Sequence, residues 1–283
     1  MDLRPMRNRS NRAAFLCYHS VAPVGPRFLT ITAELFERQL KAMRDRGLLS
    51  GDLRDLGTLV AGGSLRPSVF LTFDDGFRDN YETVLPLLRE YGFAAFIFVL
   101  PPLVDSGGAL AWPEVAEDQK RFGDSMRSVT WEMLGEMRET AFEVGSHTLT
   151  HPHLSELSGE ALREELWESR ARIVGRLGSC DAIAYPFGCW TPEVAAAAAD
   201  CGYSYGFSLP TRTGQRKAGA LSIPRINIDY RDRERRLAMK LSPWGKTVLL
   251  SPEVVAARNI LRGLRSPGGR AGDWASRPER RPS

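Results

Sequence analysis

Three of the four histidines in the chain stand within seven residues, directly after an apolar run typical of a β-strand. His147, His151 and His153 belong to the segment Glu143-Val-Gly-Ser-His-Thr-Leu-Thr-His-Pro-His. The first two are four residues apart, so a helical turn or a tight loop would direct both imidazoles at one point, as a metal site requires. His153 would face elsewhere on an extended chain, and we interpret it as a supporting residue. Alone, this spacing is more often structural, so a metal site is indicated only if a second motif supplies a further ligand.

A pair of adjacent carboxylates provides that second motif. Asp74 and Asp75 end the apolar run 69–73 and are followed by Gly76. In α/β folds, ligands bind at the carboxyl ends of parallel strands. Adjacent acids on an extended chain point to different sides, so one can bind a metal while the other acts as a base. Alone, an Asp-Gly pair indicates a turn or a helix cap equally well, but together with the histidines it favours a metal site.

The elements that must position these residues alternate in type along the chain. Short apolar runs typical of buried strands alternate with longer amphipathic runs typical of helices, which indicates a parallel sheet. The expected strands are 13–18, 68–73, 94–99, 142–145, 182–185, 204–208 and 221–226. The expected helices are 32–46, 80–91, 130–140, 158–177, 191–201 and 231–240. This order predicts one α/β barrel-like domain, with a long loop over 105–128.

Positive charge is concentrated at the two ends of the chain. Residues 1–12 carry +3 and residues 258–283 carry +5 of a formal net charge of +4, which leaves −4 for 13–257. The mildly acidic body argues against a nucleic-acid partner. The tail 266–283, rich in Pro, Gly, Ser and Arg, is predicted to be disordered. We therefore expect a basic arm (1–12), a catalytic domain (13–265) and a basic tail that either is simply solvated or contacts an anionic membrane peripherally.

Neither the cysteines nor the apolar runs indicate export. The four cysteines, Cys17, Cys180, Cys189 and Cys201, form no C-x-x-C pair and are expected to be thiols. The apolar region of a signal peptide is missing near the N-terminus, and the run 93–104 is too short to span a bilayer. We therefore expect a cytoplasmic protein, with a peripheral position at the inner membrane face if the basic tail binds lipid.

Three motifs in order resemble those of the polysaccharide deacetylases, also called the NodB-homology domain or carbohydrate esterase family 4. They are Thr72-Phe-Asp-Asp-Gly76, Ser146-His-Thr-Leu-Thr-His151 and Tyr185-Pro-Phe-Gly188. The resemblance covers residues 13 to about 230. It implies a single distorted (β/α)7-type barrel that binds one divalent metal, usually zinc, and a hydrolase that removes an N-linked acetyl group from an N-acetylated sugar in a glycan or glycoconjugate.

The same resemblance implies roles for individual residues. The implied metal ligands are Asp75, His147 and His151, and the implied general base is Asp74. Three protein ligands leave a position for water, whose pKa a metal lowers while it polarises the substrate carbonyl. The backbone N–H of Phe187 would help to stabilise the oxyanion. Tyr185 and Trp190, in and beside the third motif, are candidates for substrate binding.

Two features depart from the usual family pattern. Ala184 stands where the third motif usually has an arginine, and no histidine follows His153 to supply the usual general acid. His19, which ends the first strand-like run, resembles the acid of a circularly permuted branch, the poly-N-acetylglucosamine deacetylase-like proteins. We assign His19 that role as a hypothesis, against the alternative of a buried structural histidine. Arg225 resembles the arginine of the same branch and would orient Asp74.

Other functions stay open at this point. The same machinery would hydrolyse another amide, a cyclic imide or ureide, or an O-acetyl ester. A non-catalytic glycan-binding relative is a further alternative from a different class. Loss of an acid or histidine from the first two motifs would indicate such a relative, and all of them are present.

Overall fold

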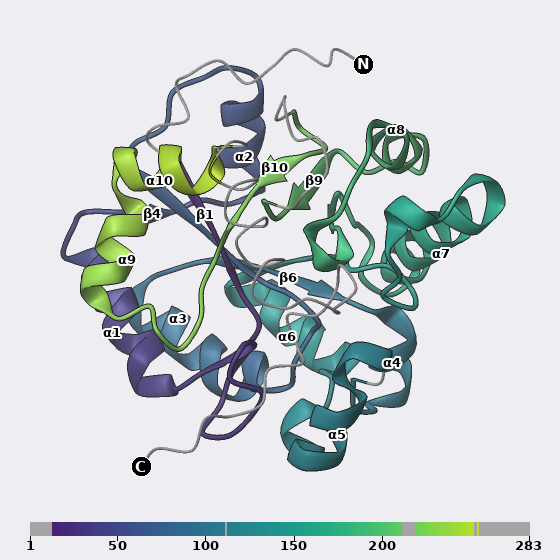
Figure 1. Ribbon diagram of the computed structural model, residues 1–283, viewed down its shortest axis with the longest axis horizontal. Coiled ribbons are helices and arrows are strands. Elements are labelled where there is room, and N and C mark those ends of the chain that lie inside the picture. The colour runs from purple at the N-terminus through teal and green to yellow at the C-terminus, as the bar shows by residue number, and fades with distance from the viewer. Residues whose placement is uncertain (1–12, 111, 211–218, 252–253, 255–283) are drawn as a thin grey trace.

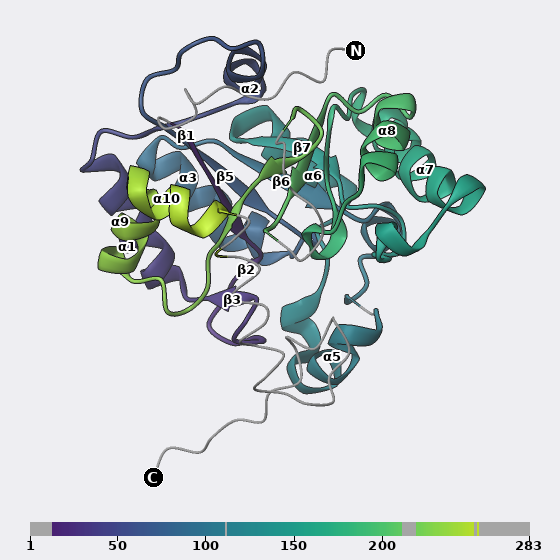
Figure 2. The same ribbon diagram turned by 45° about the horizontal axis from the view of Figure 1, so that its top comes forward.

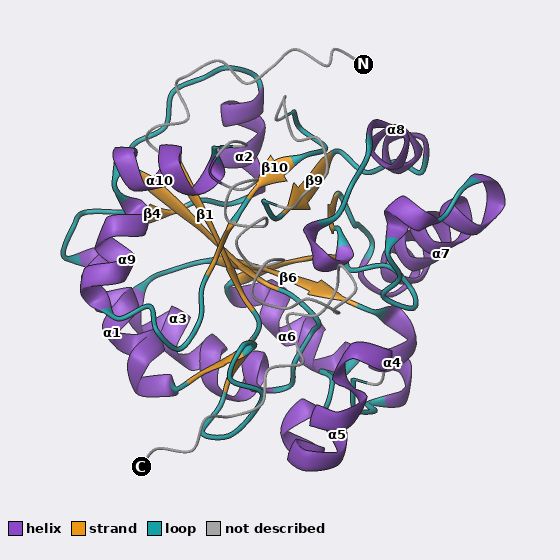
Figure 3. Cartoon of the chain, viewed as in Figure 1, coloured by secondary structure: helices purple, strands orange, loops and turns teal. Residues whose placement is uncertain are grey.

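The computed structural model describes residues 13–110, 112–210, 219–251 and 254. They form a parallel sheet that curls into a barrel, with helices around its outside (Figures 1 and 3). The strand order is β10-β9-β8-β7-β6-β5-β1-β11, and β4 pairs with β5. The expected α/β barrel is therefore confirmed. The predicted arm 1–12 and tail 266–283 lie outside the described residues.

All the apolar runs that predicted strands contain them. These strands are β1 (Ala13–Tyr18), β5 (Ser68–Phe73), β6 (Ala95–Val99), β7 (Phe142–Ser146), β8 (Ala182–Ala184), β9 (Tyr205–Ser208), β10 (Ile223–Pro224) and β11 (Ile226–Asn227). They are almost continuously buried, because helices cover one face of the sheet and side chains fill the barrel on the other. Three two-residue strands were not predicted, because they carry too few side chains for a periodic pattern: β2 (Ser20–Val21), β3 (Thr30–Ile31) and β4 (Leu49–Ser50).

The six expected helices are also present, with shifts at their ends. They are α1 (Ala33–Arg44), α3 (Leu85–Tyr91), α6 (Trp131–Thr140), α7 (Gly159–Leu177), α8 (Pro192–Asp200) and α9 (Glu234–Leu241). A π-helical segment, Asn80–Val84, precedes α3. Four further helices were not predicted: α2 (Leu53–Val60), α4 (Pro101–Ser106), α5 (Ala116–Phe122) and α10 (Pro243–Leu250). None of the helices in the described ranges has the length and hydropathy needed to cross a bilayer.

The prediction of a long loop over 105–128 is wrong in part. The stretch contains α5 between two 3₁₀ turns, Pro113–Val115 and Gly123–Met126. Figure 2 shows α5 standing apart from the barrel at the bottom of the view. The segment has a small hydrophobic cluster of its own, made of Leu100, Leu110, Trp112, Val115 and Met126 with Leu29 and Phe77. Helices of one or two turns bury too few side chains to show helical periodicity in the sequence.

One kinked segment closes the barrel. The expected strand 221–226 is in fact β10 and β11, which pair with β9 and β1 and are separated by Arg225 alone. The backbone N–H of Arg225 still donates to Ser208 at 2.9 Å, on the β9 side. The Arg225 side chain is fully buried, and its guanidinium lies 5.7 Å from the ring centre of Phe98 and 5.9 Å from that of Phe207. Barrel closure therefore places a cation inside the barrel.

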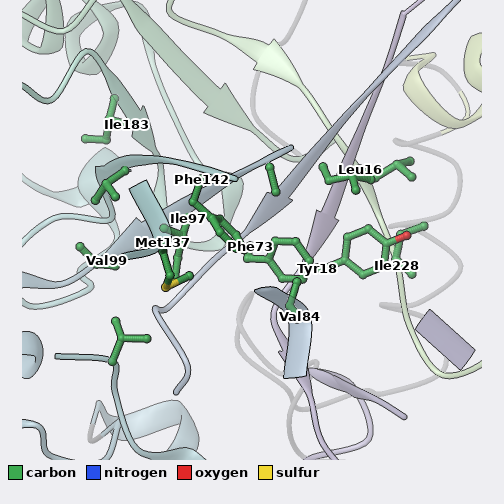
Figure 4. Close-up of a cluster of buried hydrophobic side chains, with 14 of the residues drawn as sticks. Leu16, Tyr18, Phe73, Val84, Ile97, Val99, Met137, Phe142, Ile183 and Ile228 are labelled. Atoms are coloured by element: carbon green, nitrogen blue, oxygen red, sulfur yellow. The ribbon is translucent and has the colours of Figure 1, made fainter. Parts of the chain in front are cut away.

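Aromatic packing holds the strands that lead to the candidate site. Tyr18 and Phe73, the last residues of β1 and β5, are paired in register, and their rings stack with centroids 5.3 Å apart (Figure 4). Phe142 packs edge-on against Phe73 at 5.9 Å. Full burial of such a side chain stabilises a fold by about 1.5–3 kcal/mol. His19 and Asp74 directly follow the last residues of β1 and β5, so packing of the strand ends holds the backbone from which both side chains project.

Candidate active site

Asp75, His147 and His151 converge at the carboxyl ends of β5 and β7. The Nε2 atom of His147 lies 3.3 Å from Asp75 Oδ1, and the Nε2 atom of His151 lies 3.6 Å from the same oxygen. All three side chains are buried, and Asp75 Oδ1 makes no hydrogen bond. One carboxylate oxygen and two imidazole nitrogens form a donor set that suits zinc and similar divalent ions. The residues present therefore fit a divalent metal.

The backbone around these three residues is strained. Asp75, Thr148 and His151 have φ of 71°, 72° and 62°, a left-handed conformation that costs non-glycine residues of order 1 kcal/mol or more each. We expected Asp74 and Asp75 to point to different sides because the chain would be extended there. That reason is wrong, because the chain is not extended at Asp75. The left-handed turn at Asp75 separates the two carboxylates and directs Asp75 at the histidines.

A tight loop, not a helical turn, brings the two histidines together. Ser146 Oγ accepts from the N–H of Thr148 at 3.0 Å, and Thr148 Oγ1 accepts from the N–H of His151 at 3.2 Å. Glu165 of α7 accepts from the backbone N–H groups of Leu149 and Thr150, at 2.8 and 3.1 Å. Side chains thus satisfy backbone donors that a helix would otherwise pair internally.

Each histidine ring is oriented by a neighbour. His147 Nδ1 lies 2.7 Å from the carbonyl oxygen of Ala184, so Nδ1 carries the proton and Nε2 is left for a ligand. The ring of His151 is stacked under Trp112, with centroids 4.1 Å apart and planes at 18°. Sequence reasoning missed this role of Trp112, because no motif links the 105–128 segment to the histidine loop.

Asp74 faces a different set of side chains. Arg225 donates from Nη1 to Oδ1 at 2.6 Å and from Nη2 to Oδ2 at 2.7 Å. Cys17 Sγ donates to Asp74 Oδ2 at 3.4 Å, and Thr72 accepts from Arg225 Nη1 at 2.9 Å. Burial would raise the pKa of Asp74, but the charge of Arg225, aided by His147, outweighs it and holds that pKa well below its usual range. Asp74 is therefore ionised at neutral pH.

His19 lies beside the Asp74 carboxylate. One ring nitrogen of His19, Cys17 Sγ and an Asp74 oxygen all lie within 4.8 Å of one another. The residue is half-buried, and its Nδ1 is buried without a hydrogen-bond partner. Both Cys17 and His19 belong to this group because residues two apart on an extended strand face the same side. That alternation is the signal that could have identified Cys17 from the sequence.

Burial and charge act differently on the three site histidines. Burial would lower the pKa of His147, but the carboxylates of Asp74 and Asp75 raise it above the ordinary value. Burial prevails at His151, whose pKa falls to about 3, and it also lowers the pKa of His19. Neutral imidazole is the form that binds metals, so His151 needs no deprotonation before it can act as a ligand.

The third motif contributes one clear site residue. Phe187 has φ of 59°, and its ring packs edge-on against His151 with centroids 4.6 Å apart. His153 stacks on Phe187 at 3.9 Å, and its Nε2 lies 3.8 Å from Glu114 Oε1, so His153 supports the site from outside as expected. Trp190 is half-buried, and its Nε1 is buried without a hydrogen-bond partner.

The substrate-binding expectation for Tyr185 needs correction. Its side chain is fully buried, and its hydroxyl donates to the carbonyl oxygen of Leu221 at 2.8 Å. A Cβ on Gly206 would lie only 2.4 Å from that hydroxyl, so the ring occupies space that the β9 backbone leaves free. Tyr185 is a core residue that ties β8 to the chain before β10, because the short strand turns its side chain inward.

Comparison with known proteins gives a family match over half of the chain. The sequence profile of the family described as Polysaccharide deacetylase matches residues 62–206. YxkH of Bacillus subtilis (strain 168), a protein assigned to the polysaccharide deacetylases, is 26% identical over 217 residues, which are 75% of this chain and 70% of YxkH. The chitooligosaccharide deacetylase of Rhizobium leguminosarum bv. phaseoli is 29% identical over 141 residues, which are 49% of this chain and 52% of that protein.

Two further similarities extend these findings. The poly-beta-1,6-N-acetyl-D-glucosamine N-deacetylase of Escherichia coli (strain K12) is 27% identical over 129 residues, 43% of this chain but only 18% of that protein. The structure of the Streptococcus pyogenes deacetylase PplD superimposes with a TM-score of 0.68 and 24% identity, covering 82% of this chain and 98% of that one. At this identity the superposition shows a shared barrel fold.

Proposed function

We propose the following function from the premise that the chain belongs to the polysaccharide deacetylase family: it hydrolyses the N-linked acetyl group of an N-acetylated sugar in a glycan or glycoconjugate. The observation that carries this proposal is the convergence of Asp75, His147 and His151, with the Asp74–Arg225 pair beside it. Two relatives, named as a chitooligosaccharide deacetylase and a poly-beta-1,6-N-acetyl-D-glucosamine N-deacetylase, support the substrate class.

Asp75, His147 and His151 would hold one divalent metal, for which zinc is our proposal. When bound, the ion would supply Lewis acidity that lowers the pKa of water and polarises the acetyl carbonyl. The Ala184 carbonyl and the Trp112 ring keep the two imidazoles in ligand orientation.

In the reaction, water attacks the acetyl carbon, a C–O bond forms and the C–N bond breaks, giving acetate and the free amine. Asp74 accepts a proton from the attacking water, since Arg225 keeps it ionised and fixed at both oxygens. The backbone N–H of Phe187 stabilises the developing oxyanion.

His19 delivers a proton to the leaving nitrogen, because an amine leaves poorly as an anion. Since burial lowers the pKa of the free His19, the proton has to reach it during the cycle. The Asp74 carboxyl group, which holds the proton taken from water, can supply it, because an Asp74 oxygen lies within 4.8 Å of a His19 ring nitrogen. His19 in this position supports assignment to the permuted branch.

The test combines metal content with acetate release from N-acetylglucosamine oligomers. We expect about one metal per chain in the wild type, unchanged metal in Asp74→Asn, and loss of at least about a hundredfold in acetate release in that variant. Bound metal without acetate release would support the metal site but indicate a different substrate, such as another amide, an imide or ureide, or an O-acetyl ester. Absence of bound metal after loading with zinc would overturn the mechanism. The cytoplasmic location and the membrane contact of the basic tail remain predictions.

A further inference from the structure

The two residues that follow the Asp74-Asp75-Gly-Phe-Arg run reach back to the segment around His19. Asp79 Oδ2 accepts from Ser20 Oγ at 2.7 Å, and Asp79 Oδ1 accepts from the backbone N–H of Val21 at 2.8 Å. The residues that come directly after His19 are thus held by one carboxylate. Asp79 lies some sixty residues further along the chain, so this is a tertiary contact.

Asn80 extends this contact to the backbone of His19 itself. Its Nδ2 group donates to the carbonyl oxygen of His19 at 2.9 Å and to Asp79 Oδ1 at the same distance. Asn80 is fully buried, and Asp79 is almost fully buried. One amide therefore connects the His19 backbone to the carboxylate that holds the next two residues. We call Asp79 and Asn80 the clamp.

The His19 ring has little else to fix its direction. Its Nδ1 makes no hydrogen bond, and β1 ends one residue earlier, at Tyr18. A ring without a hydrogen-bonded nitrogen takes its direction from its backbone and from packing. The backbone on the C-terminal side of His19 is held by the clamp and by the short pairing of β2 with β3, in which Ser20 lies opposite Thr30.

The clamp is also joined to the base and the metal ligands. Asp79 and Asn80 follow Asp74 and Asp75 in the same loop, and Asn80 begins the π-helical segment. The carboxylates that enter the reaction and the groups that hold the His19 backbone therefore lie on one short stretch of chain, 74–80. This arrangement fixes the distance between base and acid even though they come from different strands.

We propose that Asp79 and Asn80 are positioning residues for His19, which set its ring to protonate the leaving nitrogen. The inference rests on the acid role proposed above for His19. Misplacement of a reacting group by about 1 Å can lower a rate a hundredfold. Loss of the clamp should therefore slow the step that needs the acid while leaving metal binding and water attack intact.

Two substrates separate these steps. Acetate release from an N-acetylglucosamine oligomer needs protonation of an amine, whereas 4-nitrophenyl acetate has a leaving group that needs no proton. The variants are Asn80→Ala, His19→Ala and the double variant, with Ser20→Ala in case Asn80→Ala fails to fold. Tyr203→Phe is the matched control, because it removes a buried hydroxyl that donates to Leu166 at 2.9 Å, on α7 and away from His19.

We expect Asn80→Ala to lower kcat for the amide by about ten- to a hundredfold and kcat for the ester by less than about threefold. His19→Ala should show the same selectivity with a loss of about a hundredfold or more. The double variant should be no slower than His19→Ala alone, because the clamp acts only through His19. Tyr203→Phe should leave the ratio of the two rates unchanged.

The outcomes separate the two proposals. Equal losses on both substrates in Asn80→Ala, or losses that multiply in the double variant, overturn the clamp. If His19→Ala slows the amide and the ester equally, the acid role in the proposed function is wrong. The positioning role of the clamp, which depends on that acid role, is then wrong as well. A readout without turnover is the ¹H–¹³C ring signal of His19, readily assigned among four histidines. It should shift in Asn80→Ala and not in Tyr203→Phe, and an unshifted signal also overturns the clamp.

Discussion

Arg225 binds Asp74 through both guanidinium Nη atoms, at 2.6 and 2.7 Å, although the two residues are 151 positions apart. Both side chains are buried, and the rings of Phe98 and Phe207 pack together against the guanidinium. The pair lies where the barrel closes between β10 and β11. It therefore connects the closure of the fold to the group that we propose as the base.

Replacing Arg225 with methionine should strongly destabilise the protein. Removal of one partner leaves the buried Asp74 carboxylate unpaired, a change that usually costs about 3–5 kcal/mol. The double variant Asp74→Asn/Arg225→Met should recover a large part of that loss, since no buried charge remains. Urea denaturation of the wild type and the two variants measures both effects. A double variant no more stable than Arg225→Met would show that the charge pair is not the cause.

The two histidines on either side of Pro152 should differ in their effect on metal binding. His151→Ala removes a proposed ligand and should lower the metal content of purified protein to a small fraction of the wild-type value, with loss of the metal-dependent rise in melting temperature. His153→Ala is the matched control, because that ring contacts Phe187 and Glu114 and lies outside the ligand set. Equal metal contents in the two variants would contradict the assignment.

Asp79 should make the wild type less stable as the pH rises. Burial raises the pKa of Asp79 to about 6 from an ordinary value of 3.8, despite three hydrogen bonds to the carboxylate. Between these values the folded protein binds a proton that the unfolded chain does not. The resulting stability is present below about pH 4 and is lost as the pH rises through 6.

The measurement is the difference in unfolding free energy between wild type and Asp79→Asn, which cancels the titration of other groups. Between pH 4.5 and 7.5 the wild type should lose about 2 kcal/mol relative to the variant. A difference independent of pH would mean that the folded-state pKa of Asp79 is close to its ordinary value.

Two glycine-to-alanine changes should have opposite signs. Gly188 has φ of 68°, and a Cβ there would lie 2.3 Å from the backbone nitrogen of Leu209, so Gly188→Ala should destabilise by several kcal/mol. In α7, a Cβ on Gly175 would meet nothing within 4 Å, so Gly175→Ala should stabilise by about 0.5–1 kcal/mol. Thermal or urea denaturation compares the two. A stable Gly188→Ala protein would show that the third motif can shift.

Local patterns were enough to locate the longer strands, six of the helices and the candidate reactive residues. The apolar runs of β1, β5 and β6 are long and uniformly buried, so their composition reveals them without knowledge of their neighbours. The acids and histidines sit at the ends of such runs, where a parallel sheet directs its ligands. By contrast, α5 and the short strands β2 and β3 carry no readable period, because no residue of α5 is fully buried and each of the two strands has only two residues.

The family motifs, most of the strands and helices in their order, and the candidates for base, acid and ligands can all be read from the amino-acid sequence. The contacts that hold those candidates in place arise only when the chain folds. Folding set Trp112 over His151, placed Tyr185 in the core and joined Asn80 to His19. The physical reason is that each of these contacts joins residues far apart in the chain. Such contacts depend on barrel closure and on the left-handed turns at Asp75 and His151, which no local preference for strand or helix encodes.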